Sequence, residues 1–119
     1  MNRDEYNNFC AALPATTHVV QWGGADVWKV GGKVFAIGGW SASTDPFVTF
    51  KTTPLAFDIL KEQAGCRPAP YLASRGMKWI QRTDATTMSD DDLKDYIRMS
   101  HSLVAKGLTK KRKAELGLI

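Results

Sequence analysis

Four consecutive basic residues near the C-terminal end are the side chains best suited to bind an anion. They are Lys110, Lys111, Arg112 and Lys113, and beyond Ala105 only Glu115 opposes them. A cluster of this kind contacts the phosphate groups of nucleic acid through its charge, without reading the bases. The alternative interpretation is a solvated helix face, which is the commoner origin of a charge run.

Basic residues on the predicted strands extend the nucleic-acid hypothesis. Lys78 and Arg82 lie at alternating positions of one predicted strand, so their side chains share a face from which both could reach a phosphate backbone. The full set of candidate contacts outside the C-terminal cluster is Lys29, Lys33, Lys51, Lys78 and Arg82.

Two tryptophans, Trp22 and Trp40, lie at strand ends beside turns. We expect both side chains to be partly buried. If they were instead exposed beside Lys29, Lys33 or Lys51, they would offer an aromatic surface within positive charge. Single-stranded nucleic acid uses that combination, because its bases stack on aromatic rings while its phosphates meet cations.

The remaining reactive side chains favour neither catalysis nor metal binding. His18 and His101 lie outside the short ligand spacings of structural zinc sites, and no serine or cysteine has a base near it in sequence. The glycine pairs fit turns between strands and lack the spacing of a phosphate-binding loop. We therefore predict no enzymatic activity, no cofactor and no metal. A pocket lined by Trp22, Arg67 and Tyr71 would instead favour a small-ligand protein or an enzyme.

Local signals predict the elements that position these residues. Three signals predict helices: apolar residues at helical spacing, N-capping residues and C-terminal glycines. The predicted helices cover about 3–13, 55–64, 89–107 and 109–116. Runs of β-branched and aromatic residues predict strands over 18–22, 26–30, 33–37, 46–51 and 77–82. The order α-ββββ-α-β-αα lacks the alternation of a parallel sheet. It predicts a two-layer α+β fold, an antiparallel sheet of about five strands with helices packed on one face.

Three local details sharpen this prediction. A two-residue turn at Gly31-Gly32 would pair Val30 with Lys33 and Trp28 with Phe35. The prolines of 66–70 predict an extended surface connection. The acids at 90–92 follow a capping serine and meet the positive end of a helix dipole, whereas the basic cluster lies in the first turn of its helix, where the dipole disfavours cations.

Length and composition fit one globular domain over residues 1–119. The chain is 44% hydrophobic and 24% charged, with a formal net charge of +4. No run reaches the roughly 20 apolar residues that a membrane span needs, and Asp4 and Glu5 lie where a signal peptide would begin its apolar run. Cys10 and Cys66 form no disulfide framework. We expect a cytoplasmic protein with no membrane partner.

Several segments, in order, resemble the MmcQ/YjbR family of small bacterial proteins often labelled DNA-binding. The likeness implies a two-layer α+β fold similar to secretion chaperones, described as a double wing, and it supplies no catalytic residues. His101 departs from the family, in which tyrosine is common at this position. The last helix opens with lysines, whereas acidic residues also occur there in the family. The segments that carry the resemblance are 27–36 (VWKVGGKVFA), 48–54 (VTFKTTP), 67–72 (RPAPYL), Trp79 and 91–108.

The first functional hypothesis is a DNA-binding module that contacts the phosphate backbone through its basic surface. The alternative is a protein-interaction or chaperone-like module that self-associates, which requires an exposed apolar face or groove. A small-ligand protein is the third hypothesis.

Overall fold

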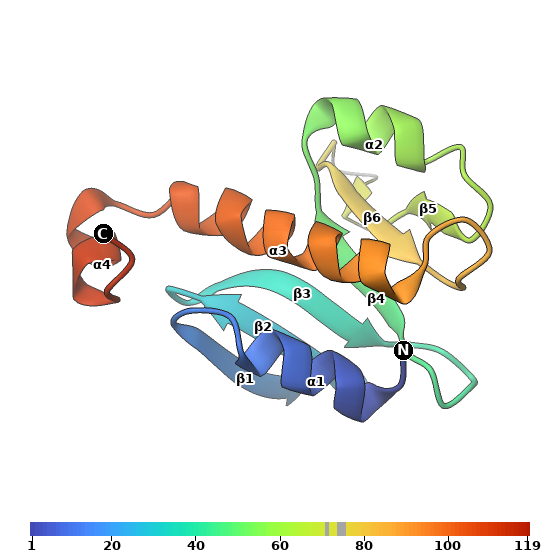
Figure 1. Ribbon diagram of the computed structural model, residues 1–119, viewed down its shortest axis with the longest axis horizontal. Coiled ribbons are helices and arrows are strands. Elements are labelled where there is room, and N and C mark those ends of the chain that lie inside the picture. The colour runs from blue at the N-terminus through green and yellow to red at the C-terminus, as the bar shows by residue number, and fades with distance from the viewer. Residues whose placement is uncertain (71, 74–75) are drawn as a thin grey trace.

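The computed structural model describes residues 1–70, 72–73 and 76–119 (Figure 1). Its helices and strands follow the predicted order, with one short strand added between the second helix and the last strand. In chain order they are α1 Arg3–Ala11, β1 Thr16–Gln21, β2 Ala25–Val30, β3 Lys33–Gly39, β4 Phe47–Lys51, α2 Pro54–Leu60, β5 Cys66–Pro68, β6 Trp79–Arg82, α3 Asp90–Lys106 and α4 Lys110–Glu115.

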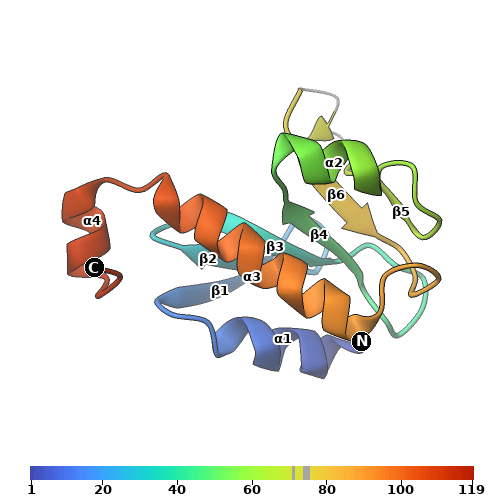
Figure 2. The same cartoon turned by 45° about the horizontal axis from the view of Figure 1, so that its top comes forward.

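The described strands form one antiparallel sheet in the order β1-β2-β3-β4-β6-β5. Helices α1, α2 and α3 cover one face, as Figure 2 shows, and their buried side chains join those of the sheet in the main core. Tyr6, Leu60 and Ile97 are among the fully or almost fully buried residues of this core. The predicted two-layer α+β fold is therefore confirmed.

Side chains cap the N-termini of the helices, as predicted for α2 and α3 and in addition at α1, whereas α2 ends at Leu60, earlier than the predicted residue 64. The side chain of Asn2 accepts a hydrogen bond from the Glu5 amide while the Glu5 carboxylate accepts one from the Asn2 amide, which completes a capping box at α1. Thr53 caps α2 with Pro54 in its first turn, and Ser89 caps α3. No helix among the described residues is both long and apolar enough to cross a lipid bilayer.

Two local predictions about the sheet need correction. The segment expected to be a surface connection contains β5, a three-residue strand that pairs with β6. The β2–β3 hairpin does pair Val30 with Lys33, but a register shift places Trp28 opposite Ala36 and leaves Phe35 as the extra residue. A bulge turns consecutive residues in unexpected directions, and here Phe35 reaches the ring of His101 in α3, at 5.1 Å between centroids.

A serine hydroxyl of α3 lies where β3 and β4 separate. The ladder between the two strands runs from Gly39–Phe47 to Ala36–Phe50, so Phe35 and Lys51 would form the next pair. Instead, the Ser100 Oγ accepts a hydrogen bond from the Lys51 amide (2.8 Å) and donates one to the Phe35 carbonyl (2.6 Å). The hydroxyl thus satisfies both backbone groups while the strands diverge.

We expect Ser100→Ala to lower the free energy of unfolding by about 1–3 kcal/mol, because it leaves a buried amide and a buried carbonyl without partners. Ser102→Ala on the exposed side of the same helix is the matched control, with an expected change within about 0.5 kcal/mol. Urea denaturation of the two variants measures the difference. Equal stabilities would mean that the hydroxyl does not hold the strand ends.

A buried carboxylate attaches α1 to the sheet. Asp26 of β2 accepts hydrogen bonds from Arg3 Nε (2.7 Å) and Arg3 Nη2 (3.1 Å), and one carboxylate oxygen lies 2.9 Å from His18 Nε2. The Tyr6 hydroxyl donates to the carbonyl of the same aspartate. The hydrogen bond from Arg3, opposed by burial, holds the pKa of the Asp26 carboxyl below its ordinary value.

We expect Asp26→Asn to lower stability at pH 7 by about 1–3 kcal/mol through the loss of charge-assisted hydrogen bonds. Because the folded pKa of Asp26 is lowered, its contribution is present above the ordinary carboxyl pKa of about 4 and is lost as the pH falls through the folded value. The variant should therefore lose less stability on acidification than the wild type. Urea denaturation from pH 7 to pH 3 tests this, with the exposed Asp58→Asn as control; parallel pH profiles would contradict it.

Candidate functional site

The basic cluster forms a short, well-capped helix at the end of α3. The Thr109 hydroxyl accepts a hydrogen bond from the Arg112 amide. At the other end Gly117 adopts φ +72°, and the amide of Leu118 donates to the Lys113 carbonyl, which is the Schellman geometry. Lys110, Lys111 and Arg112 are exposed, and Arg112 also lies 3.3 Å from Glu115.

The tip of the β2–β3 hairpin lies beside this helix in both views (Figures 1 and 2). Gly31 at the tip adopts φ +60°, and a Cβ added to it would lie 2.7 Å from the side chain of Leu108, just before α4. The close contact and the positive φ together favour glycine at this position. It brings the lysines of the hairpin to the same end of the molecule as the cluster. We call this set the basic end: Lys29, Lys33, Lys106, Lys110, Lys111, Arg112 and Lys113.

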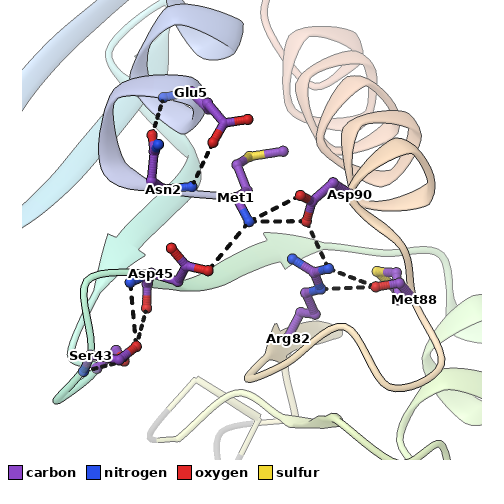
Figure 3. Close-up of polar contacts among 9 residues, drawn as sticks. Met1, Asn2, Glu5, Ser43, Asp45, Arg82, Met88 and Asp90 are labelled. Carbon is purple, nitrogen blue, oxygen red and sulfur yellow. Dashed lines mark hydrogen bonds and ion pairs between the residues drawn. The ribbon is translucent and has the colours of Figure 1, made fainter.

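Arg82 does not belong to the basic end, which corrects the prediction that it contacts phosphates. The residue is 5% exposed and faces the N-terminus of α3, where its guanidinium donates to the Met88 carbonyl and to Asp90 (Figure 3). The terminal ammonium of Met1 pairs with the same aspartate at 3.0 Å. Arg82 therefore joins β6 to α3, and a phosphate cannot reach it.

Lys78 contacts α2, whereas Lys51 lies in a groove that Lys33 of the basic end also lines. Lys78 is exposed, but its ammonium lies 4.8 Å from the ring centroid of Phe57 in α2, so it does not act together with Arg82 on one surface. Lys51, at the end of β4, is half-buried and lines a groove on the sheet. The predicted contact set thus divides into a basic end, a buried arginine, an exposed lysine beside α2 and a half-buried lysine in the groove.

The groove has a volume of about 860 Å³. It is lined along β3 by Lys33, Val34 and Ile37, and at the far end by Trp22 and Trp40. The two tryptophans are 52% and 45% exposed, so they are partly buried as expected, but about half of each side chain is open to solvent. Both rings lie at one end of the groove, and Lys33 and Lys51 line the same groove toward its other end.

Both tryptophans adopt a left-handed backbone conformation, with φ +54° at Trp22 and +65° at Trp40. Bulky residues rarely adopt this conformation. The indole N–H of Trp40 donates to the Trp22 carbonyl at 2.8 Å, which links the two turns. The strained turns thereby hold both rings at the mouth of the groove.

Among the residues that the structure describes, the lining of the groove is apolar apart from its two lysines and the indole N–H groups. Leu72, Met77 and Trp79 also line it, and no carboxylate is among its described lining residues. Trp79 is 6% exposed, and its indole N–H has no hydrogen-bond partner among the residues that the structure describes. A buried donor without a partner is costly unless it finds an acceptor.

The small-ligand pocket suggested by the sequence is only partly reproduced. Trp22 lines the groove, but Arg67 points elsewhere: its Nε donates to Gln81, and its guanidinium lies over the ring of Phe47. Tyr71 lies outside the described residues. The sequence analysis missed the apolar floor, although Val34 to Ile37 form an uninterrupted apolar run, which indicates a strand buried on both faces.

Metal binding has no support in the described part of the chain, where no three histidine, cysteine or acidic side chains gather. His18 is engaged with Asp26, and His101 Nε2 lies 2.8 Å from the Pro14 carbonyl. Burial raises the pKa of the Cys10 thiol to about 12, so this cysteine is not a nucleophile at neutral pH.

Comparisons with known proteins identify a family and a fold. The family model described as YjbR matches residues 11–103. A crystal structure of Deinococcus radiodurans protein DR2400, which carries a DUF419 domain, is similar at a TM-score of 0.82 with 24% sequence identity, covering 98% of this chain and 88% of that chain. A search of curated proteins found no match.

We expect Arg82→Ala to lower the free energy of unfolding by about 1–3 kcal/mol without changing any affinity for DNA, because it removes a buried cation with its hydrogen bonds and no surface contact. Arg98→Ala is the control, since Arg98 pairs with Asp95 on the exposed surface and such pairs contribute little. Urea denaturation and DNA titration of both variants test this. If Arg82→Ala folded and bound DNA more weakly while Arg98→Ala did not, Arg82 would have to contact DNA.

Proposed function

The chain belongs to the YjbR family, and we propose that it binds nucleic acid through the sugar–phosphate backbone, using the basic end. The observation that carries this proposal is the docking of the β2–β3 hairpin against the residue that precedes α4. This contact adds Lys29 and Lys33 to the C-terminal cluster. Glu115 is the one acid within α4, and it is already near Arg112.

Local helix stability does not account for Lys110 and Lys111, whereas Arg112 and Lys113 lie in the last turn of α4, where the helix dipole favours cations. Lys110 and Lys111 occupy the first turn, where the helix dipole disfavours positive charge. The helix nevertheless has both ends capped, by Thr109 and Gly117, and none of its residues is buried. A short helix that presents cations to solvent suits an anionic partner.

Binding of this kind is independent of base sequence. Lysines of the basic end meet phosphates as point charges, and such contacts position a protein on nucleic acid without specifying a sequence. We propose no chemical step, since catalysis has no candidate residues. The protein would act as a binding module, and its affinity would depend strongly on salt.

We expect duplex DNA to bind with a log–log salt slope of about −4, corresponding to the release of about four counterions. Lys110→Glu/Lys111→Glu should reduce affinity at low salt by at least about tenfold and reduce the slope by about two. Fluorescence anisotropy with labelled duplex and single-stranded DNA at several salt concentrations measures both quantities.

The matched control is Lys61→Glu/Lys78→Glu, which makes the same change in net charge. Both lysines lie near the ring of Phe57 on α2, a helix well separated from α4 in Figures 1 and 2. The proposal requires the control to bind more tightly than the α4 variant. Equal losses would indicate attraction by net charge alone, and no binding at low salt would refute the proposal.

A further inference from the structure

We propose that the groove along β3 binds a small amphipathic anion, an elongated molecule with an acidic head group and an apolar body. The head group would lie near Lys33 and Lys51, and the body would extend toward Trp22 and Trp40. The site shares Lys33 with the basic end but contains no residue of α4, and nothing in the proposed function requires an anion in the groove.

The length of β3 determines the shape of the occupant. Lys33 begins the strand and Trp40 follows its last residue, so at about 3.3 Å per residue the groove extends about 20 Å. Its volume of about 860 Å³ lies within the range of about 300–1,000 Å³ typical of ligand sites. An elongated ligand uses this space better than a compact one.

The charges along the groove determine the polarity of the occupant. Within β3, only Ala36–Gly39 pair with β4, so Lys33 and Val34 lie beyond the end of this pairing, and both line the groove together with Lys51. Two lysines therefore line one end, with no described carboxylate in the lining to neutralise them. The opposite end offers aromatic rings. An anion with an apolar body matches both ends.

The indole N–H of Trp79, which has no hydrogen-bond partner in the described part of the chain, supports the same polarity. Trp79 pairs with Lys51 in the register of β4 and β6, which places its ring at the basic part of the groove. A buried donor next to two cations favours an acceptor such as a carboxylate or sulfonate. Free acyl or aromatic acids share this chemistry, and their binding distinguishes the proposal from stacking of nucleic-acid bases.

The first test compares two fluorescent probes that share their rings and differ in charge. 8-Anilino-1-naphthalenesulfonate is anionic, and N-phenyl-1-naphthylamine is neutral. We expect the anionic probe to bind with one-to-one stoichiometry, and Lys51→Gln to weaken it about fivefold while the neutral probe is unaffected. Lys29→Gln, on the neighbouring strand and outside the described lining, is the matched control and should leave both probes unchanged.

The second test displaces the anionic probe with dodecanoate, dodecyltrimethylammonium or a thymidine oligonucleotide, the two amphiphiles being kept below micelle formation. Displacement by dodecanoate and not by the cation of equal tail length supports the proposal. Displacement of the probe by both amphiphiles would overturn the proposal. So would a loss of anionic-probe affinity in Lys29→Gln equal to that in Lys51→Gln. Displacement by the oligonucleotide alone would assign the groove to single strands and refute a small anion.

The two proposals can fail independently. Lys110→Glu/Lys111→Glu should retain the anionic probe, and Lys51→Gln should retain duplex DNA binding. Binding of the neutral probe by Lys51→Gln also shows that the groove is intact, so a loss of the anionic probe cannot be attributed to misfolding. An unfolded variant would lose both probes and is replaced in the test by Lys51→Arg, which should restore the anionic probe.

Discussion

The arrangement of both candidate sites depends on how α3 holds the sheet where β3 and β4 diverge. Strands that separate normally leave amides and carbonyls without partners, which is costly in a protein interior. The Ser100 hydroxyl removes this cost because it can donate and accept at the same time. The divergence leaves Lys33 beyond the end of β4, so the groove extends past Lys51 toward Val104.

The same helix connects the groove to the basic end. α3 is anchored at its N-terminus by Asp90, which accepts from Arg82 and pairs with the terminal ammonium, and in its middle by Ser100. Beyond its last turn, Leu108 packs against the hairpin tip at Gly31. These three contacts determine the direction in which α4 continues from α3. The position of the lysine cluster therefore depends on contacts that lie away from the cluster itself.

The predictable parts of the molecule are those governed by local rules. Capping by Ser89 and Thr53 determines where two helices begin, and the pair Gly31-Gly32 determines the hairpin turn. Each of these signals involves residues no more than four positions apart in the sequence. Arg82 is buried because its guanidinium bonds to Met88 and Asp90, which follow it across a loop. The alternation of Lys78 and Arg82 along the strand did not indicate this burial. Likewise, the bulge at Phe35 arises from packing against α3. Residue spacing therefore predicted the layers of the fold but not which basic side chains share a surface.

The two tryptophans show why exposure was the least predictable property. A left-handed conformation at a bulky residue costs about 1–3 kcal/mol and persists only where its surroundings hold it. At Trp22 and Trp40 the holding contact is one hydrogen bond between the turns, and roughly half of each side chain remains in water. Core packing therefore does not explain why aromatic residues occupy these positions. Small polar residues would meet the turn geometry more easily, since asparagine and glycine favour it. What the large rings add is apolar surface at the mouth of the groove, and that surface lowers the free energy of the molecule only when something covers it.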